Sequence, residues 1–268
     1  MKKKHTARIS LKNLSLTGCI AVYIMSAGCR GSVRLPAAQR QVDSLPASAL
    51  ATSAPVVAEN QLPAILIAPG LLKPYTWRNE MIDLPDSTQR DKFRMLNGIK
   101  ANVNWSGIVP LEEGDFECYT FSLINKKDTL FRIDSVFKVW LPEAGGDWVS
   151  IQLKKEVAET NSPGTVYLVS IVNGEALVVD QDIHNVTNAP IVKVEDVTYV
   201  FYVKDDKIYR YNIAEKKTSA IAKLKYKDID GESIDPYKLE VMQTAPTPGF
   251  RLVLHYNGRY YFIPFSIG

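Results

Sequence analysis

The chain has 268 residues, of which 46% are hydrophobic and 23% charged, a composition typical of a globular protein with a real core. Its formal net charge of +3 arises at the N-terminus, because residues 1–28 hold five of the 32 basic residues and none of the 29 acidic ones. The other 27 basic residues balance the 29 acidic ones. Composition therefore gives no reason to expect a nucleic-acid-binding protein.

A basic leader, MKKKHTARISLKN, precedes an apolar run from Leu14 to Ala27. A helix that crosses a membrane needs about 20 apolar residues, whereas a run of about 14 is typical of the core of a secretory signal peptide. No other stretch of the chain reaches spanning length. We therefore predict a cleaved signal peptide at residues 1–28, with a short uncleaved anchor as the alternative.

Two cysteines near this run follow small residues, in "LTGC" at Leu16–Cys19 and "SAGC" at Ser26–Cys29. Both resemble the lipobox of bacterial lipoproteins, in which the cysteine receives a diacylglyceryl group and becomes the first residue of the mature protein. "LTGC" matches the usual pattern better, because leucine stands three residues before its cysteine. Cys19, however, follows Lys12 after a run about half as long as the shortest normal signal-peptide core.

We therefore expect Cys29 to be the lipidated residue, with lipidation at Cys19, or none, as the alternatives. The resemblance implies a membrane-anchored lipoprotein of the cell envelope, facing the periplasm or the cell exterior. With Cys29 acylated and Cys19 removed, Cys118 would be the one free thiol of the mature chain, so no internal disulfide could form. Stability would then come from packing alone.

Residues 29–60 are dominated by Ala, Pro, Ser and Val and contain no aromatic residue, so we predict a flexible, disordered tether. Residues 61–110 lead into the body. In this stretch "LPAILIAPGLL", Leu62–Leu72, predicts a docking strand at Ala64–Ala68, or alternatively a segment that inserts into a partner protein. The following "LPDSTQRDKFRMLNGIK" predicts one short helix, with Asp86 or Ser87 as N-cap and Gly98 as its stop.

Residues 111–268 alternate between apolar and polar side chains, which is typical of strands. Turn signals at Asn125–Asp128, Asn173-Gly174, Asp205-Asp206 and Asn257-Gly258 separate the runs, and Asn-Gly is among the strongest hairpin signals. The body should therefore be all-β and antiparallel. An antiparallel β-sandwich or incomplete barrel explains these strands, and a small or partial β-propeller is the alternative, because the turns recur at uneven, blade-like intervals.

Three groups of residues are candidate sites. Asp180, Asp182 and His184 alternate, so on a regular strand they would face one side and could bind a metal ion. Five tyrosines crowd the C-terminal strands and could stack on a sugar or peptide, although packing within the sheets explains them as well. These are Tyr209, Tyr211, Tyr256, Tyr260 and Tyr261. Cys118 is in phase with Thr120 and Ser122, and we interpret it as a packed thiol rather than a nucleophile.

The sequence contains no nucleophile elbow, paired-histidine zinc motif, Cys-x-x-Cys or phosphate-binding glycine loop. We therefore predict a non-catalytic accessory or protein-interaction subunit of the envelope, with no cofactor, a protein partner and no nucleic acid. A glycan- or peptide-binding module that uses the C-terminal tyrosines is the alternative. An enzyme would need two carboxylates that face each other across a cleft.

Overall fold

The computed structural model describes residues 62–76, 90–111, 114–140, 142–155, 163–184, 187–242 and 249–266. Nearly all of these residues are in β-strands or turns, and the predicted all-β, antiparallel class is confirmed. No helix within these ranges is long and apolar enough to cross a membrane. Cys19, Cys29 and the predicted tether at 29–60 lie outside the described residues.

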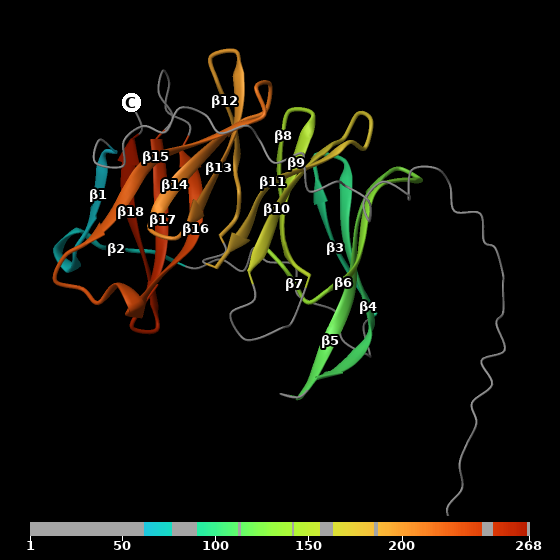
Figure 1. Cartoon of the computed structure of the whole chain (residues 1–268), viewed down its shortest axis with the longest axis horizontal. Coiled ribbons are helices and arrows are strands. Elements are labelled where there is room, and N and C mark those ends of the chain that lie inside the picture. Colours follow the sequence, from blue (N-terminus) through green and yellow to red (C-terminus); the bar gives the residue numbers. More distant parts are fainter. Residues whose placement is uncertain are drawn as a thin grey trace, which may run out of the picture. The chain divides into compact units, whose positions relative to one another are not determined.

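The strands form four sheets that follow one another along the chain (Figure 1). The first sheet contains β3 (Asp91–Leu96), β4 (Ile99–Leu111), β5 (Gly114–Asn125) and β6 (Asp128–Val136). The second contains β7 (Lys138–Val139), β8 (Glu143–Gly145), β9 (Trp148–Lys154), β10 (Gly164–Ser170) and β11 (Ala176–Ile183). The third contains β12 (Ile191–Val194), β13 (Val197–Lys204), β14 (Lys207–Asn212) and β15 (Lys217–Tyr226). The fourth contains β16 (Ile234–Met242), β17 (Gly249–Tyr256) and β18 (Arg259–Ser266).

Three apolar clusters join these sheets in series. One cluster lies between the first and second sheets, one between the second and third, and one between the third and fourth. Strand β13 shows the consequence, because Val200 and Tyr202 pack toward the second sheet while Phe201 and Val203 pack toward the fourth. A sandwich has a single interface between two sheets, whereas these four sheets have three interfaces in series. Sequential meanders that stack face to face in this way are arranged like the blades of a partial propeller.

The segment before the first sheet docks on the last two sheets. Strand β1 (Ala64–Ile67) pairs in parallel with β15, and Ile67 is fully buried in the cluster between the third and fourth sheets. After a single 3-10 turn at Pro69–Leu71, β2 (Lys73–Pro74) pairs with β18. Both strands appear in cyan beside the orange and red strands in Figure 1. The predicted docking strand is therefore confirmed, and its partners belong to the far end of the chain.

The predicted short helix is wrong, because its C-terminal half is strand β3 in a hairpin with β4. Asn97 and Gly98 have φ values of 48° and 87°, as the tight turn between paired strands requires. Leu96 is buried, whereas Phe93 is 56% exposed and lies under the Lys100 ammonium, so the two point to opposite faces. Asp86 and Ser87 lie outside the described residues. The antiparallel region thus begins upstream of residue 111.

The four hairpin turns predicted downstream are all present. Lys126, Gly174, Asp205 and Gly258 have φ values of 55°, 72°, 51° and 70°, and each lies in a turn between two consecutive strands. The segment Glu143–Asp147 is divided between a strand and a turn. Its first half is strand β8, which pairs with β9, and only the second half is a turn.

Candidate functional site

The structure does not bring Asp180, Asp182 and His184 together as metal ligands. Register irregularities interrupt the β10–β11 pairing between Gly164 and Tyr167, and Asp182 has a φ of 58°. This left-handed conformation breaks the alternation of side chains on which the metal prediction depended. Asp182 and His184 are exposed, whereas Asp180 is half-buried. Within the described part of the chain, no group of three or more His, Cys, Asp or Glu side chains could hold a metal ion.

Asp180 instead links the second sheet to the third. Its Oδ1 lies 2.9 Å from the Lys204 Nζ, and its Oδ2 accepts a hydrogen bond of 2.8 Å from the Tyr202 hydroxyl. Lys204 also donates to the carbonyl of Gln181 at 2.7 Å. Burial raises the pKa of Tyr202 above its ordinary value, and the nearby Asp180 charge raises it further. Asp180 is therefore a structural acceptor for a buried phenol.

Replacing Asp180 with Ala is expected to lower the free energy of unfolding by about 1–3 kcal/mol, because the buried Tyr202 hydroxyl loses its acceptor. Urea denaturation monitored by circular dichroism measures this loss. Asp182→Asn is the matched control, because it removes the same charge from an exposed position and Asn tolerates the left-handed conformation. Equal losses in both variants, reversed by adding a divalent metal ion, would support the metal prediction instead.

The five C-terminal tyrosines are divided between two sheets. Tyr211 is buried between the second and third sheets, and the Tyr209 ring stacks on Tyr202 with centroids 5.5 Å apart. Burial raises the pKa of both Tyr209 and Tyr211. In the fourth sheet, Tyr256 and Tyr261 contact each other with ring centroids 6.4 Å apart.

The Tyr260 side chain and that of its neighbour Tyr261 lie on opposite faces of β18, because successive side chains of a strand point to opposite faces. Its ring contacts Tyr237 at 4.9 Å and His255 at 5.0 Å between centroids. The five tyrosines therefore do not form one aromatic row. Four of them contact another aromatic ring and Tyr211 is buried, as is common for aromatic residues of paired strands.

Cys118 is buried, with 7% of its surface exposed, and shares its face of β5 with Thr120 and Ser122. The opposite face of β5 carries Tyr119 and Phe121 into the core between the first and second sheets. The interpretation of Cys118 as a packed thiol is confirmed.

A polar cavity of about 570 Å³ lies where β8, residues 188–191 and β16 meet. Asn188 is buried and is one of the residues that line it. The side chain accepts from the Leu239 N–H at 2.7 Å and donates to the Leu239 carbonyl at 2.9 Å and to Glu143 at 2.8 Å. The Asn188 amide thus supplies hydrogen-bond partners for the N–H and the carbonyl of Leu239 in β16, as the backbone of a neighbouring strand would.

The charged groups beside Asn188 are paired with one another. Glu240 accepts from the Tyr75 hydroxyl at 2.6 Å and from the Lys238 ammonium at 3.2 Å, and Arg251 lies 4.0 Å from its second oxygen. Lys238 is itself buried. The contact between Lys238 and Glu240 joins two residues of strand β16, whereas the Nε of Arg251 is buried without a hydrogen-bond partner in the described residues.

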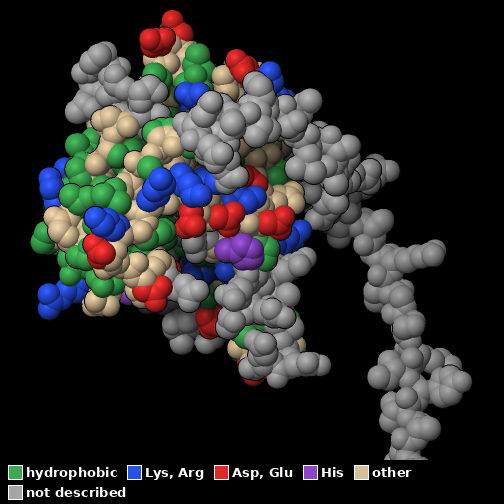
Figure 2. Space-filling view, turned by 60° about the vertical axis from the view of Figure 1, so that its left-hand side comes forward, with side chains coloured by type: hydrophobic (Ala, Val, Ile, Leu, Met, Phe, Trp, Pro, Cys, Tyr) green, Lys and Arg blue, Asp and Glu red, His purple; other side chains and the backbone are tan. Residues whose placement is uncertain are grey.

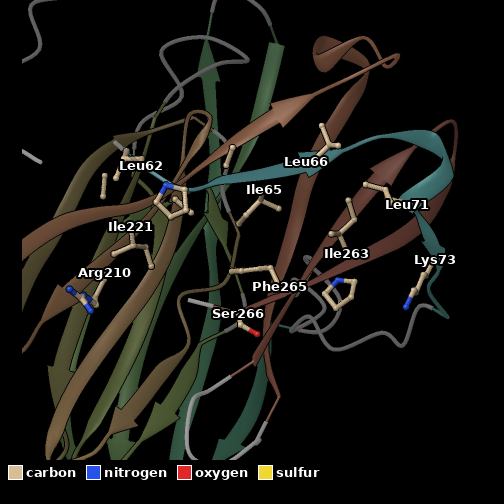
Figure 3. Close-up of a pocket in the computed structure, with 15 residues that line it drawn as sticks. Leu62, Ile65, Leu66, Leu71, Lys73, Arg210, Ile221, Ile263, Phe265 and Ser266 are labelled. Atoms are coloured by element: carbon tan, nitrogen blue, oxygen red, sulfur yellow. The ribbon is translucent and has the colours of Figure 1, made fainter. Parts of the chain in front are cut away.

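A second cavity, of about 740 Å³, is mostly apolar and lies beneath the segment that carries β1 (Figure 3). Its walls come from β1, from β14 and β15 of the third sheet, and from β18 of the fourth. Ile65, Ile221 and Phe265 are among the lining residues, and Leu66 and Leu71, which also line it, are 43% and 47% exposed. The ionisable residues of the lining are Lys73 and Arg210. Within the part of the chain that the structure describes, this apolar cavity is the candidate binding site.

Sequence reasoning indicated only one wall of this cavity. The dense apolar run Leu62–Leu72 was a visible signal, whereas Arg210 and Ile263 lie in strands whose partners the sequence does not specify. On the face shown in Figure 2, basic and acidic side chains lie next to one another. This mixture agrees with the near balance of charge outside residues 1–28.

No protein-family model matches this chain, and no curated protein matches it. Among solved structures, the chain is similar to a sialidase of Trypanosoma rangeli, with a TM-score of 0.38 and 8% identity over 63% of this chain and 29% of that one. It is also similar to an oligogalacturonate lyase of Vibrio parahaemolyticus, with a TM-score of 0.35 and 11% identity over 69% of this chain and 48% of that one.

A third similar structure is the β-propeller domain of the Trilobed protease from Pyrococcus furiosus, with a TM-score of 0.34 and 11% identity over 72% of this chain and 59% of that one. The chain thus spans less than two thirds of the length of each of these three proteins. At such identities and TM-scores, no activity is carried over to this chain.

Proposed function

We propose that this chain is a membrane-anchored lipoprotein of the cell envelope whose β body is a non-catalytic accessory or interaction subunit. The observation that carries the proposal is the lining of the apolar cavity beneath β1. It contains aliphatic side chains, proline, Phe265, one serine and two basic residues, with no carboxylate, imidazole or thiol. General acid–base and nucleophilic catalysis draw on those groups, whereas binding needs apolar contact and a few fixed charges.

The interaction role is supported by the segment that covers this cavity. Leu66 and Leu71 expose large apolar side chains on a segment that is itself fixed by pairing to β15 and β18. Apolar side chains held on a rigid scaffold are suited to contact a partner, because little conformational freedom is lost on binding.

The anchor is tested by labelling bacteria that express the full chain with an alkyne analogue of palmitate. We expect the purified wild-type chain to carry the label, Cys29→Ala to lose it and Cys19→Ala to retain it. Cys118→Ala serves as a second cysteine control and should retain it as well. If the label persisted in Cys29→Ala and disappeared in Cys19→Ala, Cys19 would be the lipidated first residue of the mature protein. A wild-type chain without label would contradict the lipid anchor.

The interaction role is tested separately, by amine-reactive crosslinking of intact cells followed by isolation of the chain from membranes. We expect a discrete crosslinked species that weakens when Leu71 is replaced by Ser, because the substitution removes exposed apolar surface. Leu71→Met keeps that surface apolar and should retain the species. A chain that is solitary in wild-type cells would contradict the proposal even if the anchor were present.

A further inference from the structure

The apolar cavity is built where the last two sheets and the β1 segment meet. Ala64, Ile65 and Leu66 of β1 form one wall, Ala220, Ile221 and Ala222 of β15 a second, and Ile263 to Ser266 of β18 a third. These walls are held by backbone pairing, since Ala64 pairs with Lys223 and Ile67 with Tyr226. A cavity lined by paired strands is preformed, so a ligand would not have to order it.

The charge of this lining has one sign. Arg210 and Lys73 are the ionisable residues that line the cavity, and both carry a positive charge at neutral pH. In Figure 3, Arg210 lies to the left and Lys73 to the right, with Ile65, Ile221, Phe265 and Ile263 between them. The Arg210 guanidinium lies over the Tyr199 ring, 4.9 Å from its centroid, which restricts the side chain's freedom.

We propose that this cavity binds an amphipathic organic anion, with its apolar body against the three walls and its acidic head at Arg210 or Lys73. An apolar lining favours a hydrocarbon or ring system, and two cations without a neighbouring carboxylate in the lining favour a negative head group. A volume of about 740 Å³ suits a ligand of ordinary drug or short-lipid size. This inference is independent of the lipid anchor and goes beyond the accessory role.

Two dyes that share a ring system separate the contributions of shape and charge. 8-Anilinonaphthalene-1-sulfonate carries a sulfonate, and N-phenyl-1-naphthylamine is the same skeleton without it. Fluorescence titration of the full chain is expected to show saturable binding of the sulfonate at one site, at least about tenfold tighter than binding of the neutral dye. Equal affinities for both dyes, or no saturable binding, would overturn the proposal.

Charge-neutral variants locate the head group. Arg210→Gln and Lys73→Gln are expected to weaken binding of the sulfonate about threefold to tenfold, with most of the loss in one of them, and to leave the neutral dye unchanged. Lys217→Gln is the matched control, because it removes the same charge from an exposed position of β15 that does not line the cavity. Equal loss in Lys217→Gln would mean that net charge alone attracts the dye, and the proposal would fail.

Leu66→Glu tests whether the cavity itself holds the anion, because it places a negative charge at an exposed position of the lining. It should abolish binding of the sulfonate, and an unchanged thermal unfolding midpoint shows that the fold persists. If this variant does not fold, the two glutamine variants still decide the question. Displacement of the dye by dodecanoate would indicate a free amphiphile, whereas displacement only by phosphatidylglycerol vesicles would indicate a lipid held in a bilayer. Failure of both to displace the dye would contradict the ligand class.

Discussion

Replacing Asn188 with Ala is expected to lower the free energy of unfolding by about 3 kcal/mol, the largest loss among the polar substitutions considered. The side chain is 4% exposed and makes three hydrogen bonds, two of them to the backbone of Leu239. Its removal leaves a buried N–H and a buried carbonyl of β16 without partners, and each unsatisfied group costs about 1–3 kcal/mol. Urea denaturation at neutral pH measures the change.

Asn173→Ala is the control for Asn188→Ala. The Asn173 side chain accepts one exposed hydrogen bond from the backbone of Glu175, within the same turn. Its loss is expected to cost about 1 kcal/mol or less, because water replaces the contact. If the two variants lost similar stability, Asn188 would not be the link between β16 and the neighbouring sheets that its distances indicate.

The second large effect is expected for Gly145→Ala, at the end of β8. A Cβ at this position would lie 2.7 Å from the Cβ of Ile191 and 2.8 Å from its Cγ2. Ile191 belongs to β12, so the added methyl group would force the second and third sheets apart at this point. Overpacking of this kind costs about 1–3 kcal/mol.

Differential scanning calorimetry of Gly145→Ala should therefore show a lower unfolding midpoint than wild type. Gly70→Ala is the matched control, because a Cβ there meets no atom within 4 Å and its φ is not in the left-handed range. We expect Gly70→Ala to change stability by no more than about 0.5 kcal/mol. A lower midpoint in both variants would show that the loss reflects glycine itself rather than the contact with Ile191.

The strands could be predicted from the sequence wherever a local signal specifies the turn. Asn257-Gly258 is such a signal, since both residues have the positive φ of a tight hairpin, and Gly174 has a positive φ in the longer turn between β10 and β11. Asn97-Gly98 is the same dipeptide, and the helix prediction failed because Gly98 belongs to a hairpin turn and does not end a helix. A turn signal within a short segment thus outweighs the capping signals of a helix.

The candidate site could not be predicted in the same way, because its contacts join residues far apart in the chain. Ile65, Arg210 and Ile263 line the apolar cavity together through a stacking of sheets that no local pattern encodes. The expected metal site failed for a related reason. Its alternation assumed a regular strand, and the irregular pairing of β11 near Asp182 left no local signal.

The pairing of β1 with β15 and of β2 with β18 has a consequence for the order of folding. Ala64 pairs with Lys223 and Lys73 with Phe262, so these contacts join residues separated by most of the described chain. Contacts of such high sequence separation form slowly and late. Until then the apolar stretch from Leu62 to Leu72 is without its native strand partners, and a chaperone that holds this stretch would delay closure of the last two sheets without affecting the first.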